Sequence, residues 1–336
     1  MIPVTVITGF LGSGKTTLLC RLLGRADLAD TAVIVNEFGE TDLDHTLISA
    51  SSENIVQLMN GCICCTIRQD LALELRNLFY LRALGDVPRF NRVLIETTGL
   101  ADPVPIIHTL MANTELKKVY RMQSVVTLVD AMAGERTLDD QPISVRQVAL
   151  ADHLLITKAD IAEQDAVDQL VTRLAGINPA VDSVSIDTAD LSAWLDVNHY
   201  PVRQHSHIED WLVEPVTRPG AHTHTAHSSD IVNFTLEIDR PLSLAQLVLF
   251  FQELVNYRPD DLLRVKGLVA VADRLSTPAV VHCIRDKVYP LVWLDQWPQN
   301  KGPNAAPVAR RSKLIFITRD LGQAEVEKIL REVCEL

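Results

Sequence analysis

Short apolar runs and segments with helical spacing follow one another along the first half of the chain. The runs are rich in Val, Ile and Leu, whereas Leu71, Leu75 and Leu78 show the spacing of a helix face. Continuous apolar runs of this length are typical of parallel strands that are buried on both faces. The pattern therefore predicts an α/β domain with a mostly parallel sheet and helices packed against it. The expected strands are residues 4–7, 31–35, 54–58, 92–95, 124–130, 153–156 and 181–186.

The second half of the chain shows a different pattern. Apolar and polar residues alternate over 231–239, which predicts a strand with one buried face. Ser243 is expected to cap an apolar helix at 244–256. Further strands are expected at 262–272, 279–285 and 313–318, and a last helix near 322–334. These elements predict a smaller α+β domain. The buried face of its first strand is expected to contain Val232, Phe234, Leu236 and Ile238.

The stretch between the two patterns is rich in proline and polar residues. This composition is typical of an interdomain linker, so we expect domains at 1–196 and 230–336 joined by 197–229. Neutral imidazoles in the linker would suit Zn²⁺, Ni²⁺ or Co²⁺, and a solvated linker with incidental histidines is the equal alternative. Six of the ten histidines fall here: His199, His205, His207, His222, His224 and His227.

Charge and hydropathy exclude several classes of function. The 336-residue chain has a net charge of −12, which argues against a nucleic-acid binder and a membrane-surface protein. No apolar run approaches the roughly 20 residues that span a bilayer. The start, Met1-Ile2-Pro3, lacks the basic region of a signal peptide, so we expect a cytoplasmic protein.

The strongest motif is Gly9-Phe10-Leu11-Gly12-Ser13-Gly14-Lys15-Thr16, which fits the phosphate-binding P-loop pattern G-x-x-x-x-G-K-[ST]. The motif lies between a predicted strand and an apolar helix, where backbone N–H groups and the helix N-terminus bind phosphate. Lys15 would reach the β- and γ-phosphates, and the Thr16 hydroxyl would ligate Mg²⁺. The residues expected to bind the nucleotide phosphates are Gly12, Ser13, Gly14, Lys15, Thr16 and Thr17.

Two further segments belong with a P-loop. The strand at 92–95 ends in Glu96, as in a Walker B element that holds Mg²⁺, and Gly99 follows where a backbone N–H can meet the γ-phosphate. The loop Asn36–Glu40 is a candidate γ-phosphate switch, with an ordinary acidic loop as the alternative. Glu37 is a candidate for positioning the attacking water or the Mg²⁺ shell. The expected catalytic residues are Lys15, Glu37 and Glu96.

Three cysteines, Cys62, Cys64 and Cys65, lie in a turn before a predicted helix. The positive end of a helix favours the thiolate, which is the metal-binding and nucleophilic form. Cys64 and Cys65 must point in different directions, so core packing explains the cluster poorly. Metal binding is the favoured interpretation, and redox chemistry and a structural role are the alternatives.

The tetrad Thr157-Lys158-Ala159-Asp160 follows a predicted strand and is a candidate base reader. The Asp160 carboxylate can accept hydrogen bonds from N1–H and the 2-amino group of guanine, whereas adenine offers neither donor. The stem of Lys158 can lie over the flat base. Together with the P-loop and Glu96, the tetrad favours GTP over ATP.

These motifs together resemble the CobW/YjiA group of metal-linked P-loop GTPases, in which Glu replaces the Asp of most GTPases in the third nucleotide motif. The resemblance implies a P-loop domain followed by a smaller α+β domain. It also implies slow GTP hydrolysis coupled to metal delivery or insertion, with Cys62, Cys64 and Cys65 as metal ligands and Glu40 as a further ligand. The matching segments are Gly9–Thr16, Asn36–Glu40, Gly61–Cys65, Glu96–Pro103 and Thr157–Asp160.

The first hypothesis is a GTPase that uses GTP and Mg²⁺ and transfers Zn²⁺, or Co²⁺, to a client metalloprotein. Thiolate ligands favour Zn²⁺ or Cu(I), so delivery of Co²⁺ would require control by geometry or supply. A regulatory GTPase without metal delivery and a P-loop small-molecule kinase are the alternatives. The base reader argues against the kinase, and the cysteine cluster argues against a purely regulatory role. The sequence leaves the identity of the client and the formation of a homodimer open.

Overall fold

The computed structural model describes residues 1–23, 28, 30–35, 56–57, 67–181, 183–186, 231–298 and 311–334, with side chains for all of these except 23, 56–57 and 67–70. The described residues form two compact units, 1–171 with 183–186 and 172–181 with 231–334. Three predicted features lie outside the described residues: the switch at 36–40, the cysteine turn at 61–66 and the linker at 197–229. The proposed domain boundaries also fall outside them and stay predictions.

The first unit contains a seven-stranded sheet in the order β3-β2-β4-β1-β5-β6-β7, and neighbouring strands pair in parallel throughout. All seven predicted strands are confirmed. The strands are β1 (Ile2–Gly9), β2 (Thr31–Val35), β3 (Val56–Gln57), β4 (Arg92–Glu96), β5 (Tyr120–Asp130), β6 (His153–Thr157) and β7 (Ser183–Ser185).

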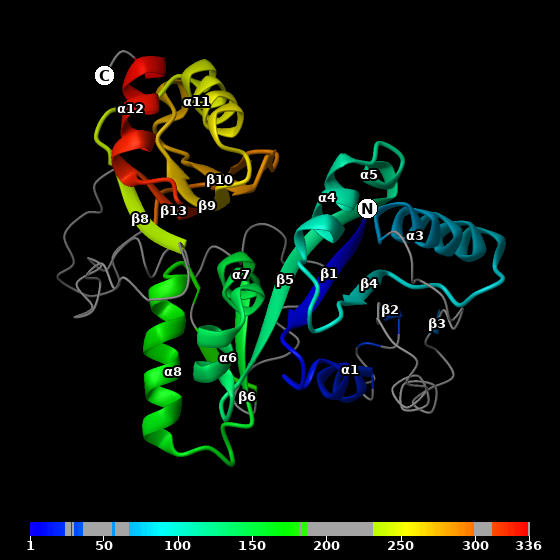
Figure 1. Cartoon of the computed structure of the whole chain (residues 1–336). Helices are drawn as coiled ribbons and strands as arrows, with labels where there is room; N and C mark the ends of the chain where they lie inside the picture. Colours follow the sequence, from blue (N-terminus) through cyan, green and yellow to red (C-terminus); the bar gives the residue numbers. More distant parts are fainter. Residues whose placement is uncertain are drawn as a thin grey trace. The chain divides into compact units, whose positions relative to one another are not determined.

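Helices cover both faces of this sheet (Figure 1). The apolar side of α1, formed by Leu18, Leu19 and Leu22, packs on one face against residues of the central strands. On the other side of the strands α3 lies next to α4. Parallel strands need crossover helices, which is why both faces are buried and the strands are apolar throughout. The helices are α1 (Lys15–Leu23), α3 (Ile67–Leu84), α4 (Val104–Ala112), α5 (Leu116–Val119), α6 (Gly134–Asp140), α7 (Pro142–Leu150) and α8 (Gln164–Ile177).

The second unit contains an antiparallel sheet in the order β11-β10-β9-β13-β8, with β12 paired to β10. Helices α11 and α12 lie next to each other and share one core with the sheet, so the predicted α+β domain is confirmed. Its elements are β8 (Ile231–Ile238), α11 (Leu244–Tyr257), β9 (Leu262–Val269), η3 (Ala272–Arg274), β10 (Ala279–Ile284), β11 (Lys287–Val288), β12 (Val292–Trp293), β13 (Ser312–Arg319) and α12 (Gln323–Cys334).

Two local predictions in this unit have different outcomes. The Ser243 cap is confirmed, because its hydroxyl accepts the Gln246 N–H at 3.1 Å and the Gln246 side chain accepts the Ser243 N–H at 2.9 Å. The alternation in β8 holds only toward its end. Leu236 and Ile238 are buried, whereas Val232 is 45% exposed. Phe234 nevertheless stacks on Phe316 of β13 with ring centroids 5.1 Å apart.

Candidate functional site

The P-loop joins the end of β1 to the start of α1, as the motif predicts. Gly12 and Gly14 have φ of 76° and 89°, a left-handed backbone that glycine adopts without steric cost. The Lys15 ammonium folds back and donates to the carbonyl oxygens of Gly9 at 2.9 Å and Phe10 at 3.1 Å. This side chain is only 7% exposed, so its charge lies inside the loop where a phosphate would be cradled. Of the two neighbouring predicted residues, Ser13 is buried and Thr17 is exposed.

Two predicted Mg²⁺ ligands lie beside each other. The Thr16 hydroxyl donates to Glu96 Oε1 at 2.8 Å, across a contact between α1 and the end of β4. Glu96 is 5% exposed. Hydroxyl and carboxylate oxygens are the hard donors that Mg²⁺ prefers, so the two side chains fit this ion. They would hold the ion, which supplies charge neutralisation to the phosphates.

Gly99 lies directly against the P-loop. A Cβ added to Gly99 would come within 2.6 Å of the backbone nitrogen of Leu11 and 2.8 Å of its Cα. The turn after β4 is hydrogen-bonded to β1 at its first residue, because the Thr97 N–H donates to the Ile7 carbonyl at 2.9 Å. The predicted γ-phosphate contact is therefore next to the loop that would bind the other phosphates.

The candidate base reader is joined to the P-loop at the end of β6. The Thr157 hydroxyl donates to the Ser13 carbonyl at 3.0 Å. Lys158 has φ of 58°, uncommon for a residue with a side chain, and its ammonium lies 2.6 Å from Asp130 Oδ2. Asp160 follows at an exposed position, free of the sheet, where its carboxylate can meet a base.

Some predicted site residues cannot be placed. Glu37, Glu40 and the three cysteines of the cluster lie outside the described residues. Within the described ranges, no group of three or more His, Cys, Asp or Glu side chains could hold a metal ion. The described helices also include none with the length and apolar character needed to cross a membrane.

The structure brings two residues to the site that the motifs did not indicate. Asp130 ends β5 as Glu96 ends β4, and polar residues at the carboxyl ends of parallel strands often face ligands, so its position was a usable signal. Gln147 lies on α7 and donates to the carbonyl oxygens of Gly99 and Ala101. Its only signal was an amide next to the apolar buried residues Val145, Val148, Ala149 and Leu150 of the helix.

Comparison with known proteins agrees with this geometry. Residues 3–185 match the family described as CobW/HypB/UreG, nucleotide-binding domain, and residues 231–334 match the cobalamin synthesis protein cobW C-terminal domain. The chain is 32% identical to zinc chaperone YjiA of Escherichia coli (strain K12), over 97% of this chain and 96% of that protein. It is 30% identical to zinc chaperone CobW of Pseudomonas aeruginosa, over 98% and 91%.

The structural comparison covers both units. The crystal structure of Zn(II)-bound YjiA GTPase from E. coli matches with a TM-score of 0.71 and 28% identity, over 99% of this chain and 98% of that one. Both domain families therefore occur in the expected order, and the nucleotide motifs meet at one edge of the sheet. This chain belongs to the CobW/HypB/UreG family of nucleotide-binding proteins, in the form that carries a CobW C-terminal domain.

Proposed function

We propose that this protein is a GTPase metal chaperone, which couples the binding and hydrolysis of GTP to the transfer of zinc to a client metalloprotein. The observation that carries the nucleotide half of the proposal is the contact between Thr16 and Glu96 under the P-loop. It places a hydroxyl and a carboxylate together as Mg²⁺ ligands, next to the buried ammonium of Lys15. The relatives named zinc chaperone and Zn(II)-bound GTPase support both the nucleotide and the metal.

The roles of individual residues follow from their chemistry. Lys15 and the P-loop amides bind the phosphates, Thr16 and Glu96 hold Mg²⁺, and Asp160 selects guanine. Gly99 meets the γ-phosphate, and Glu37 orients the attacking water.

Zinc is held by the thiolates of the cysteine cluster, with Glu40 as a further ligand. Because the switch and the cysteine turn both follow strands of the nucleotide sheet, the γ-phosphate can change the geometry of the metal site. Co²⁺ as cargo, a homodimer, the client and a cytoplasmic location stay predictions.

The decisive experiment is a zinc competition titration with a chromophoric chelator. It is run with Mg²⁺ and a non-hydrolysable GTP analogue, and again with Mg²⁺ and GDP. A nucleotide-gated carrier should show affinities that differ by about tenfold or more, which is about 1.4 kcal/mol of coupling free energy. Cys64→Ala should abolish the difference. Cys20→Ala, a partly exposed cysteine of α1, is the matched control and should keep it.

The alternatives give different results in the same experiment. Equal zinc affinities with both nucleotides would favour a regulatory GTPase without metal delivery. Failure to bind zinc at all would leave the cysteine cluster without its proposed role. Binding of ATP in preference to GTP, with turnover that depends on an acceptor molecule, would favour the small-molecule kinase.

A further inference from the structure

The turn that follows β4 is held from two sides. On one side the Gly99 backbone packs on Leu11 of the P-loop, closer than any side chain would allow. On the other side a single side chain, Gln147 of α7, donates from Nε2 to the Gly99 carbonyl at 3.2 Å and to the Ala101 carbonyl at 3.0 Å. The two peptide groups that follow Gly99 and Ala101 are thus oriented by one amide.

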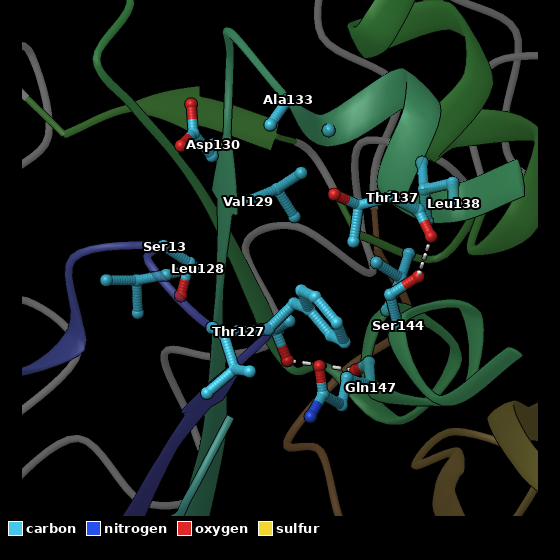
Figure 2. Close-up of a pocket in the computed structure, with 14 residues that line it drawn as sticks. Ser13, Thr127, Leu128, Val129, Asp130, Ala133, Thr137, Leu138, Ser144 and Gln147 are labelled. Atoms are coloured by element: carbon cyan, nitrogen blue, oxygen red, sulfur yellow. Dashed lines mark hydrogen bonds between the residues drawn. The ribbon is translucent and has the colours of Figure 1, made fainter. Parts of the chain in front are cut away.

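Gln147 is itself firmly placed. It is 1% exposed, and its main-chain carbonyl accepts the Thr127 hydroxyl of β5 at 2.9 Å (Figure 2). The helix is therefore tied to the strand next to β1, and β1 leads into the P-loop. Any movement of the Gly99 turn relative to the P-loop must change the two hydrogen bonds of this side chain.

The oxygen atom of the Gln147 amide is in an unusual environment. Gln147 Oε1 is buried and has no hydrogen-bond partner among the described residues. The two carbonyl acceptors fix the orientation of the amide, because a flipped amide would place Oε1 against them. A small cavity of about 30 Å³, lined by Phe10, Leu11 and Leu138 among others, lies beside it (Figure 2). An apolar side chain would fill this helix position without an unsatisfied oxygen, so the amide is explained by the turn that it holds.

We propose that Gln147 is a positioning residue that holds the Gly99 and Ala101 carbonyl groups, fixes the turn whose Gly99 N–H meets the γ-phosphate, and so makes the site distinguish GTP from GDP. The inference rests on the proposed GTPase function, in which Gly99 N–H meets the γ-phosphate. GDP lacks that phosphate, so only the triphosphate senses where the turn lies. Gln147 does not touch the nucleotide, and it acts through the carbonyl groups of Gly99 and Ala101.

The test compares Gln147→Met with the wild type in binding a fluorescent GDP and a fluorescent non-hydrolysable GTP analogue, each with Mg²⁺. Methionine has nearly the same shape and no N–H donor. We expect GDP affinity within twofold of wild type and a loss of about tenfold for the analogue, as for one hydrogen bond to a charged group. In steady state the KM for GTP should rise by a similar factor while kcat changes less, because the contact is already made in the bound triphosphate.

Ser144→Ala is the matched control. Ser144 is also a buried polar residue of α7, and its hydroxyl donates to the carbonyls of Thr137 and Gln141, away from the Gly99 turn. Its GDP and analogue affinities should both equal those of wild type. If Gln147→Met folds poorly, Gln147→Asn keeps the amide but is one methylene too short for both carbonyls, and it should give the same split.

A variant that loses affinity for GDP and the analogue equally would show a merely structural role and overturn the inference. Unchanged affinities for both would overturn it as well. If the wild type binds neither nucleotide, the proposed GTPase function fails first and this inference with it. Wild-type binding with an unaltered variant would contradict the inference alone, so the two failures are distinguishable.

Discussion

Thr16 and Glu96 are 80 positions apart in the chain, yet the Thr16 hydroxyl donates to Glu96 Oε1 at 2.8 Å. The contact exists because β1 and β4 are neighbouring parallel strands, so the helix after β1 begins beside the end of β4. Both oxygen atoms belong to types that Mg²⁺ prefers. The predicted cation site is therefore built where the carboxyl ends of two strands meet.

Glu96→Gln should weaken Mg²⁺ binding. The substitution keeps the shape of the side chain and removes the negative charge that attracts the cation. We expect the apparent Mg²⁺ affinity in GTP hydrolysis to fall by about 10- to 100-fold. The measurement is the hydrolysis rate as a function of Mg²⁺ at saturating GTP. Glu115→Gln, an exposed acid paired with Arg76, is the control and should leave the Mg²⁺ dependence unchanged.

Asp160→Asn should change base selectivity. In its proposed role the carboxylate accepts hydrogen bonds from two donors of guanine, and an asparagine amide replaces one acceptor with a donor. Xanthine carries a carbonyl where guanine has the 2-amino group, so the variant should bind GTP about 10- to 100-fold more weakly and XTP more tightly. Competition between the two nucleotides measures this. Asp165→Asn, which removes an exposed charge in the first turn of α8, should leave the preference for GTP intact. Unchanged GTP binding in Asp160→Asn would show that the tetrad does not read the base.

Gly9→Ala should destabilise the first unit by more than the cost of placing a side chain at a positive φ. A Cβ at Gly9 would lie 2.4 Å from the Leu128 carbonyl oxygen and 2.7 Å from Ser13 Oγ, so β5 or the P-loop must shift. Gly85 also has a positive φ, of 82°, but a Cβ there meets nothing within 4 Å. We expect Gly85→Ala to cost about 1–2 kcal/mol of unfolding free energy and Gly9→Ala more than about 3 kcal/mol. Urea unfolding compares the two, and equal losses would contradict the close approach.

Alkaline pH should lower the stability of the folded chain. Burial raises the pKa of the Cys283 thiol well above its ordinary 9.0, and Asp286 raises it further. Burial likewise raises the pKa of Tyr120 well above 10.0, partly offset by Arg82. Both groups stay neutral in the folded state and ionise when unfolded. The contribution of Cys283 is therefore complete below its unfolded pKa of 9.0, and that of Tyr120 below its unfolded pKa of 10.0. Each contribution is lost as the pH rises above that value, by about 1.4 kcal/mol per pH unit and group.

The measurement for this pH dependence is urea unfolding between pH 8 and pH 10.5. Cys283→Ala removes one of the two titrating groups, so its free energy of unfolding should decline less steeply above pH 9. The same slope for wild type and variant would show that the thiol does not contribute.

The local order of apolar and polar residues was sufficient to predict most of the secondary structure. The prediction failed where polar residues are buried by tertiary packing. The first sheet was predictable because strands buried on both faces are apolar throughout. β5 is the exception at its start. It begins at Tyr120, four residues before the expected Ser124. The sequence pattern missed this earlier start because Gln123 and Arg121 interrupt the apolar run. Gln123 is nonetheless 5% exposed and paired with Arg121, so tertiary packing extends the strand through polar residues.

The amino-acid sequence by itself determined the nucleotide motifs and their order. Each depends on a few adjacent residues, such as Gly14-Lys15-Thr16, whose backbone and side chains act locally. The sequence also determined the two fold classes, because the periods of a strand and a helix are local properties.

Only the tertiary structure decided which residues from separate motifs meet. Strand order in the sheet places Glu96 beside Thr16, Asp130 beside Lys158, and Gln147 behind Gly99. These pairs form because the central strands end at one edge, and strand order depends on packing among segments far apart in the chain. No local pattern encodes that packing. The place of Asp130 at the end of an apolar run was a usable signal, whereas Gln147 entered the site only with the fold.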